Sequence, residues 1–240
     1  MRGAAPVLLL ALVGGACAGP GGGGAGPVPP PDAPGPPLAE KAARFEAGLD
    51  ARHLLPWGAL GYRVRLPESG TGPGTPTYGS DTVAWTGALL AAEAERAAAT
   101  GEAAAFERVR TLLGGLGTLG AVAGERGHFA RYACPAGFLP AEPHPEEWHD
   151  GAEGFEGWRW RGDLSKDQVA GLVHGLAAVG DLVPDAGAKA RAAWLLGGLA
   201  DRVLGGGGVV RDADGSPTTY GDLSPRVAGF PVGVNAAIAL

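Results

Sequence analysis

The sequence predicts an all-α domain of layered helical hairpins, accompanied by one short β-hairpin. Three observations predict it. Two segments of the chain carry no charged side chain, an amphipathic helical pattern follows each of them, and the two pairs share short motifs at a constant spacing. We expect this domain to span residues 38–240, behind an N-terminal signal and a spacer.

Residues 1–17 have the organisation of a bacterial secretory signal. Arg2 supplies a positive charge, residues 7–13 form an apolar run, and small residues precede Cys17. The apolar run is too short to cross a bilayer as a helix, which takes about 20 residues. The segment resembles a lipoprotein signal, in which the cysteine is acylated; simple cleavage is the alternative. We therefore expect an exported, lipid-anchored protein of a bacterial cell envelope.

Residues 18–37 are rich in glycine and proline and have almost no apolar side chains. Such a segment cannot bury enough surface to offset the conformational entropy of folding, so we expect a disordered tether between lipid and domain. The net charge is −6 and the basic residues are scattered singly, which argues against nucleic acid as a partner. Cys134 is then the one thiol left in the mature chain, and we expect it to be a small buried residue rather than a nucleophile.

The two uncharged segments are residues 82–92 and 169–180. A helix that is apolar all round is buried all round, so we expect both to lie inside the domain. In the second segment, Gly171 and Gly175 belong to a face of small residues where a neighbouring helix can approach closely. His174 lies in the same segment, and we expect a hydrogen-bonded core histidine there.

An amphipathic helix is expected after each uncharged one. Residues 106–119 and 192–203 both place aliphatic residues at steps of three and four, with charged residues on the opposite face. The motif Leu-Leu-Gly-Gly-Leu occurs at residues 112–116 and again at 195–199, which indicates an internal repeat. Chance similarity between two helices rich in alanine, glycine and leucine is the alternative.

Two further segments do not follow the helical pattern. Residues 125–161 contain aromatic residues and proline with little periodicity, and loops this long are usually functional or disordered. Near the end of the chain, residues 209–211 and 218–220 flank the turn sequence Asp-Ala-Asp-Gly, which predicts a β-hairpin.

Acidic residues precede each uncharged helix. Asp81 lies before the first, Asp163 and Asp167 lie at the start of the second, and Asp222 precedes an apolar C-terminal segment. Helix capping is one interpretation, because Asp at a helix start accepts hydrogen bonds from free backbone N–H groups. The other is that packed helices bring these carboxylates to one pocket, where crowding shifts their pKa values and separates an acid from a base.

Aromatic residues cluster just before Asp163. Sugar rings stack on tryptophan faces, so these residues are candidates for a ligand wall, and packing at the edge of the core is the alternative. The cluster is Trp148, Phe155, Trp158 and Trp160, with Trp57 and Trp85 earlier in the chain. His144 and His149, with two glutamates between them, match no compact metal signature, so we expect no metal and no cofactor.

Residues 158–168, with the sequence Trp-Arg-Trp-Arg-Gly-Asp-Leu-Ser-Lys-Asp-Gln, and residues 79–90 resemble the six-hairpin glycosidase superfamily. Members of that superfamily fold as α/α toroids and act on glycans. The resemblance covers roughly residues 38–240 and implies part of a toroid, because only about half of a full ring of helices is counted here. Residues 232–240 form an apolar pattern without a stop signal, as expected of a fragment.

The resemblance implies a glycan ligand and general acid/base hydrolysis, and it nominates Asp81, Asp163 and Asp167 by position. We expect Asp163 or Asp167 to act as the acid, with Asp81 or Asp222 assisting. The residues expected to bind the substrate are Trp85, Trp158, Trp160, Arg161 and Gln168. The alternative is a non-catalytic helical module, displayed at the cell surface for binding or as a scaffold.

Overall fold

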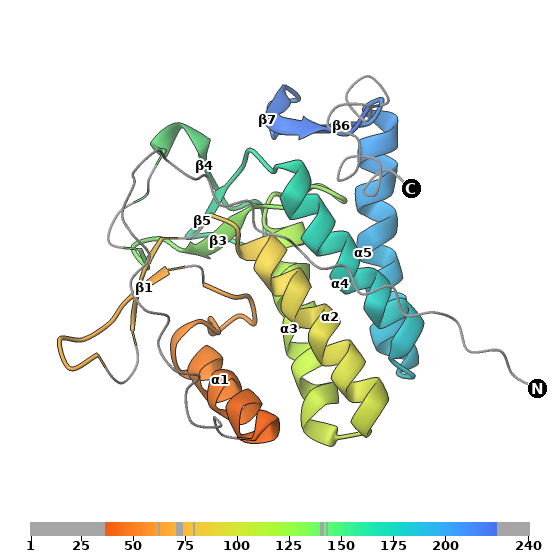
Figure 1. The fold of residues 1–240 in the computed structure, drawn as a ribbon. Coiled ribbons are helices and arrows are strands. Elements are labelled where there is room, and N and C mark those ends of the chain that lie inside the picture. The colour runs from red at the N-terminus through yellow and green to blue at the C-terminus, as the bar shows by residue number, and fades with distance from the viewer. Residues whose placement is uncertain are drawn as a thin grey trace, which may run out of the picture.

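The computed structural model describes residues 37–61, 63–70, 74–78, 80–139, 142 and 144–224 (Figure 1). Cys17, most of the predicted spacer and the apolar segment 232–240 lie outside these residues. The described chain contains both helices and short antiparallel strands. In chain order these are α1 (Leu38–Arg52), β1 (Arg63–Arg65), β2 (Thr75–Tyr78), α2 (Thr82–Thr100), α3 (Ala103–Ala121), β3 (Tyr132–Pro135), η1 (Pro145–Glu147), β4 (Trp148–Asp150), β5 (Trp158–Arg161), α4 (Lys166–Leu182), α5 (Ala186–Gly205), β6 (Val209–Arg211) and β7 (Pro217–Asp222).

The all-α prediction is therefore wrong. Within the described residues, five helices stand beside seven strands in three small sheets, a mixed content that is not that of an α/α toroid. The expected hairpin near the end of the chain is present, because β6 pairs with β7 in antiparallel register. The error lies mainly in residues 125–161, where β3, β5 and β4 form a three-stranded antiparallel sheet.

The four helices predicted from periodicity are present as two helical hairpins. α2 and α3 form the first hairpin and α4 and α5 the second, and α2 lies beside α4 in front of α3 and α5 (Figure 1). Gly101 ends α2 in the left-handed conformation with φ 68°, which glycine adopts without steric cost. Pro184 follows α4 and keeps Val183 extended, so the helix cannot continue.

Small residues allow α2 and α4 to pack closely, as the sequence predicts. A Cβ atom on Gly87 would lie 2.1 Å from the carbonyl oxygen of Gly171, and one on Gly175 would lie 2.3 Å from that of Gly87. These separations are far below van der Waals contact, so each position accepts only glycine unless the helices move apart.

The uncharged helices are not buried on every side, which corrects the predicted layering. Trp85 on α2 is 52% exposed. His174 on α4 is exposed rather than a core histidine. Helix α2 packs against α3, α4 packs against α5, and the two helices pack against each other, while alanines such as Ala88 and Ala92 on α2 are exposed to solvent. Alanine and glycine carry no charge and yet expose little apolar area, so absence of charge does not by itself mean burial.

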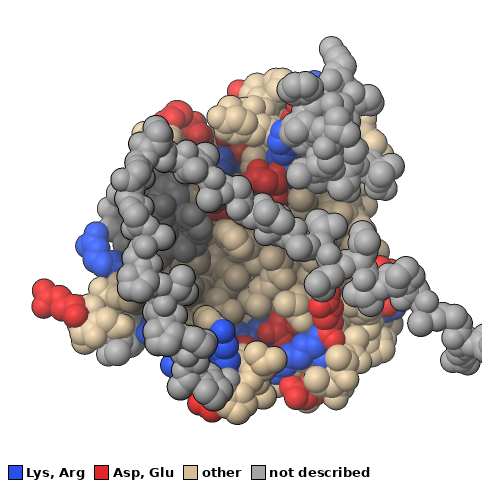
Figure 2. Space-filling model, in the orientation of Figure 1, with Lys and Arg blue, Asp and Glu red and all other residues tan. Residues whose placement is uncertain are grey.

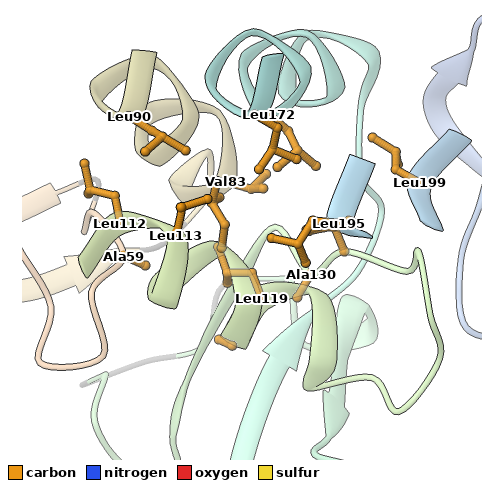
Figure 3. Close-up of a cluster of buried hydrophobic side chains, with 14 of the residues drawn as sticks. Ala59, Val83, Leu90, Leu112, Leu113, Leu119, Ala130, Leu172, Leu195 and Leu199 are labelled. Atoms are coloured by element: carbon orange, nitrogen blue, oxygen red, sulfur yellow. The ribbon is translucent and has the colours of Figure 1, made fainter. Parts of the chain in front are cut away.

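The core lies between the two hairpins and the sheet. Figure 3 shows leucines of α2, α3, α4 and α5 pointing into one cluster. The labelled side chains from these helices are Val83, Leu90, Leu112, Leu113, Leu119, Leu172, Leu195 and Leu199, all of them buried. Burying an aliphatic side chain contributes about 1.5–3 kcal/mol, so this cluster is the main source of cohesion between the hairpins.

The three-stranded sheet extends the core at one end of the helices. Cys134 on β3 is buried, as expected, and burial raises the pKa of its thiol to about 12. Trp148 on β4 and Trp160 on β5 are also buried. The indole N–H of Trp160 donates to the carbonyl oxygen of Asp150 at 3.0 Å. These aromatic residues are part of the core, as in the alternative interpretation above.

None of the described helices is both long and apolar enough to cross a membrane.

Candidate functional site

Arg131 lies where the start of α2 meets the turn before α4. Its Nε donates to the carbonyl oxygen of Ser80 at 3.2 Å, and its Nη1 donates to the carbonyl oxygen of Asp163 at 3.1 Å. The same guanidinium contacts two carboxylates, with Nη2 3.3 Å from Oδ1 of Asp81 and Nη1 3.6 Å from Oδ2 of Asp163. One cation thus brings together two of the acidic residues nominated by the sequence.

Asp81 is held from the other side by Gln168. The Nε2 of Gln168 donates to Oδ1 of Asp81 at 2.7 Å and approaches the carbonyl oxygen of Ser80 at 3.2 Å. Both neighbours are acceptors, which fixes the orientation of the amide. The Oε1 of Gln168 is buried and has no hydrogen-bond partner among the described residues. The Asp81 side chain stays 31% exposed, so this carboxylate is reachable from solvent.

Asp163 has a strained backbone, with φ 55° in the left-handed region that non-glycine residues rarely adopt. Three contacts hold it there. Its N–H donates to Oδ2 of Asp212 at 2.8 Å, its Oδ1 accepts from the N–H of Thr219 at 2.6 Å, and its carbonyl oxygen accepts from Arg131. Strain that several contacts impose together is common at functional sites, where it fixes a side chain in one direction.

Asp212 holds the backbone of Asp163 in this turn, and His128 lies beside the Asp212 carboxylate. Nε2 of His128 lies 3.7 Å from Oδ1 of Asp212, and the His128 side chain is buried. Burial and the nearby Arg202 lower the pKa of His128 from 6.5 to about 4, so the ring is neutral at neutral pH. Residue 162, directly before Asp163, is a glycine. A Cβ atom at this position would lie 2.4 Å from the Asp212 carboxylate, so a larger residue does not fit.

The helix-capping interpretation does not hold for Asp81. Asp81 is the N-cap residue of α2, yet its side chain makes no capping hydrogen bond within the described chain. Ser165 at the N-cap of α4 likewise makes none. The carboxylate that does cap a helix is Asp185, which accepts from the N–H of Ala188 at 3.0 Å at the start of α5. The Asp81 carboxylate is instead directed at Arg131 and Gln168.

Asp167 and Asp222 have different surroundings. Asp167 is exposed in the first turn of α4. Oδ1 of Asp222 accepts from the N–H of Ser224 at 2.8 Å in a local turn after β7. Of the four predicted catalytic carboxylates, Asp81 and Asp163 share Arg131, whereas Asp167 is exposed and Asp222 lies at the end of β7.

Of the residues predicted to bind a substrate, Trp85 fits this site best, whereas Gln168 is fully buried and positions the Asp81 carboxylate instead of offering a surface to a ligand. Trp85 lies one turn after Asp81 on α2, and residues four apart share a helix face. Trp160 is buried, and Arg161 is buried with its Nε 2.5 Å from Oε2 of Glu147, so neither offers a surface to a ligand.

Trp158 is half-buried and belongs to an aromatic cluster. Its ring meets those of Trp57 and Phe155 edge to face, with centroid distances of 5.2 Å and 5.6 Å. The predicted ligand wall of tryptophans in this part of the chain is therefore largely a part of the core.

Figure 2 shows the surroundings of the site on the molecular surface. Acidic and basic side chains gather over the start of α4, and a broad surface without charge covers α2 and α4 beyond them. A guanidinium, two carboxylates and an amide meet where the start of α2 approaches the turn before α4. Such a set of donors and acceptors beside an apolar face suits a ligand that carries both hydroxyl groups and C–H surfaces.

One group of potential metal ligands occurs in the described chain. Ligand atoms of His144, Glu146 and Glu147 lie within 4.8 Å of one another, and the first two residues are exposed. Glu147 is already paired with Arg161. We therefore assign no metal to this group.

Sequence reasoning missed Arg131, Asp212 and Thr219. All three lie in or beside strands, and Arg131 directly precedes β3 in the segment interpreted as a loop. The available signal was the alternation of aromatic and charged residues at 158–161, with the sequence Trp-Arg-Trp-Arg, which is typical of strands.

In comparisons with protein-family models, with curated proteins and with solved structures, no match to this chain was found. The resemblance to six-hairpin glycosidases thus gains no support from them, and any function must be argued from the Asp81–Arg131–Asp163 site itself.

Proposed function

We propose that the domain binds a glycan at the Asp81–Arg131–Asp163 site. The observation that carries this proposal is the position of Trp85, whose exposed indole lies one helical turn from a carboxylate that Arg131 and Gln168 hold in place. A sugar ring has an apolar face of C–H groups and a rim of hydroxyl groups. An exposed indole suits the first, and a fixed carboxylate suits the second.

Rigidity of the polar groups supports binding. Asp81, Asp163 and Arg131 come from three separate parts of the chain, and each is fixed by at least two contacts. A ligand that meets preorganised groups pays less entropy on binding than one that must order them. The exposed fractions of 31% for Asp81, 15% for Asp163 and 13% for Arg131 leave these groups in part accessible.

Hydrolysis of the glycan is a second candidate, favoured by the two carboxylates on one guanidinium. Glycosidases use a pair of carboxyl groups within about 10 Å, one as acid and one as base or nucleophile. In this reaction Asp163 would serve as the acid and Asp81 would assist.

In the cell, we propose that the protein is exported and anchored through acylation of Cys17. The support is the organisation of residues 1–17, with a positive charge, an apolar run and small residues before the cysteine. The glycan would then be part of the cell envelope or lie outside it.

A glycan array with matched tryptophan variants tests the binding proposal. We expect Trp85→Ala to lose at least about ten-fold in affinity, since one stacked aromatic face contributes roughly 1–3 kcal/mol of apolar burial. Trp194→Ala is the control, because Trp194 on α5 is 54% exposed and Trp85 is 52% exposed. Both variants should melt at the wild-type temperature. Equal affinities of the two variants, or no bound glycan, would favour the non-catalytic scaffold instead.

Reducing-end release from the bound glycan separates binding from hydrolysis. If the protein hydrolyses its ligand, Asp163→Asn should abolish release while it keeps binding. Asp167→Asn should leave both unchanged, because Asp167 is exposed outside the cluster. Binding without release in the wild type would rule out the hydrolytic candidate and leave the binding proposal intact.

A further inference from the structure

Helix α1 has three acidic residues, of which two face the rest of the domain and the third, Glu40, lies in the first turn. Glu46 and Asp50 face the rest of the domain, where Oε1 of Glu46 lies 2.9 Å from Nη1 of Arg96 and Oδ2 of Asp50 accepts from Nη2 of Arg108 at 2.7 Å. These two ion pairs, one helical turn apart, hold the helix in a defined rotation against α2 and α3.

The opposite side of α1 carries basic and apolar side chains together. We call it the outer face of α1 and define it by Leu38, Lys41, Arg44, Phe45 and Arg52, which line one open cavity together with Gly48, Leu49 and His53. Leu38 is 84% exposed and Phe45 is 64% exposed. None of the residues of α1 is buried. The described chain therefore leaves two large apolar side chains in water between cationic ones.

We propose that the outer face of α1 binds the surface of an anionic phospholipid bilayer. Helices that lie in the interface of a membrane combine apolar side chains, which enter the acyl boundary, with Lys and Arg beside the headgroups. The outer face has both. The chain as a whole has a net charge of −6, so this local excess of positive charge is not a property of the general surface.

The apolar residues favour a bilayer over a soluble polyanion. An anionic polysaccharide would neutralise Lys41 and Arg44 but would leave Leu38 and Phe45 exposed to water. A bilayer interface takes up both kinds of side chain at once, since headgroups meet the cations and the acyl boundary meets the aromatic ring. The position along the chain agrees, because α1 begins directly after the spacer that follows Cys17.

This inference deepens the proposed membrane localisation and is independent of the glycan site. The outer face of α1 would be a second contact with the membrane, separate from the lipid on Cys17. It is tested on the full chain with Cys17→Ser, which cannot be acylated, so that its outcome does not depend on the lipid.

The experiment is co-sedimentation with vesicles of phosphatidylglycerol and phosphatidylcholine, compared with vesicles of phosphatidylcholine alone. We expect binding to the anionic vesicles only. Lys41→Glu with Arg44→Glu should weaken it by at least about ten-fold, because each basic residue near an anionic surface contributes about five-fold. Lys189→Glu with Arg191→Glu is the control, since it makes the same change in net charge on α5. The apolar run at residues 7–13 is present in every variant, so any binding of this run to vesicles does not affect the comparison.

A second pair of substitutions separates the bilayer from a soluble polyanion. Leu38→Ser with Phe45→Ser should weaken vesicle binding and leave the melting temperature unchanged, because these side chains are exposed. Two results would instead assign the outer face to an anionic polysaccharide. One is vesicle binding that depends on Lys41 and Arg44 but not on Leu38 and Phe45. The other is a higher affinity of the protein for heparin than for the anionic vesicles. Equal loss in the α1 and α5 charge variants would overturn the proposal altogether.

Discussion

His128 shows how one buried side chain makes the site depend on pH. The pKa of its ring falls from 6.5 to about 4 through burial and the charge of Arg202. The ring lies 3.7 Å from the Asp212 carboxylate, which in turn holds the N–H of Asp163. Protonation of His128 would place an additional buried charge beneath the strained turn, and we expect the fold to oppose it.

The sign of the resulting pH dependence follows from linkage. Because the pKa is lower in the folded state than in the unfolded state, the unfolded chain binds the proton first as the pH falls. Stability is therefore unaffected above about pH 6.5 and decreases between pH 6.5 and pH 4, by a total on the order of 3 kcal/mol. Chemical denaturation across this range measures it. His128→Gln should remove this component, and an unchanged slope in the variant would refute the assignment.

Cys134 provides a test of burial at a single thiol. Burial raises the pKa of the thiol to about 12, and thiolate is the reactive form. In the chain with Cys17→Ser, we expect a thiol reagent to leave Cys134 unmodified under native conditions and to label it fully in denaturant. Mass spectrometry of the labelled protein measures this. Rapid labelling of the native protein would show that the sheet opens easily or that the thiol is exposed.

At the scale of the elements, the contact between α2 and α4 depends on glycine. Gly175 lies against Gly87, where a Cβ atom would be 2.3 Å from a carbonyl oxygen, whereas a Cβ on Gly180 would meet no atom within 4 Å. The two glycines are on the same helix and differ in what surrounds them. Substitution of each glycine by alanine therefore distinguishes the effect of helix packing on stability from the effect of helix propensity.

We expect Gly175→Ala and Gly180→Ala to change stability in opposite directions. Gly175→Ala should destabilise the domain by about 1–3 kcal/mol, because overpacking pushes the helices apart. Gly180→Ala should stabilise it by up to about 1 kcal/mol through the better helix propensity of alanine. Thermal melting of both variants measures the difference. A neutral effect at Gly175 would mean that α2 and α4 are not held this closely in solution.

The whole molecule is joined through Arg131. Its side chain contacts residues just before α2 and in the turn before α4, and its backbone N–H donates to the carbonyl oxygen of Arg161 in the sheet at 2.9 Å. The two helical hairpins and the three-stranded sheet therefore meet at one residue. The candidate site is at this junction, where several elements fix each polar group.

Arg131→Met should reduce both stability and glycan binding. Loss of the guanidinium leaves Asp81 and Asp163 close together without their shared cation. An unpaired, partly buried charge lowers the free energy of unfolding by roughly 1–3 kcal/mol. Arg126→Met is the control, since Arg126 forms an exposed pair with Asp201 at 3.0 Å and such pairs contribute only about 0–1 kcal/mol. Equal melting temperatures for the two variants would show that Arg131 does not join the elements.

The sequence alone determined the four main helices, the hairpin of β6 and β7, the glycine contact between α2 and α4 and the burial of Cys134. Each of these follows from local periodicity or from the size of single residues. It also singled out Asp81, Asp163, Trp85 and Gln168, because they lie at or near helix starts and carry polar or aromatic groups. Their roles stay predictions.

Only the tertiary structure decided the remaining features. The sheet of β3, β5 and β4 pairs residues such as Tyr132 and Arg161 that are far apart in the chain, and the local pattern of a strand does not say which distant segment it pairs with. For the same reason Arg131 was not expected beside two carboxylates. Exposure of one face of α2 and α4 depends on which elements cover them, and this is a property of the assembled fold rather than of the helices' own residues.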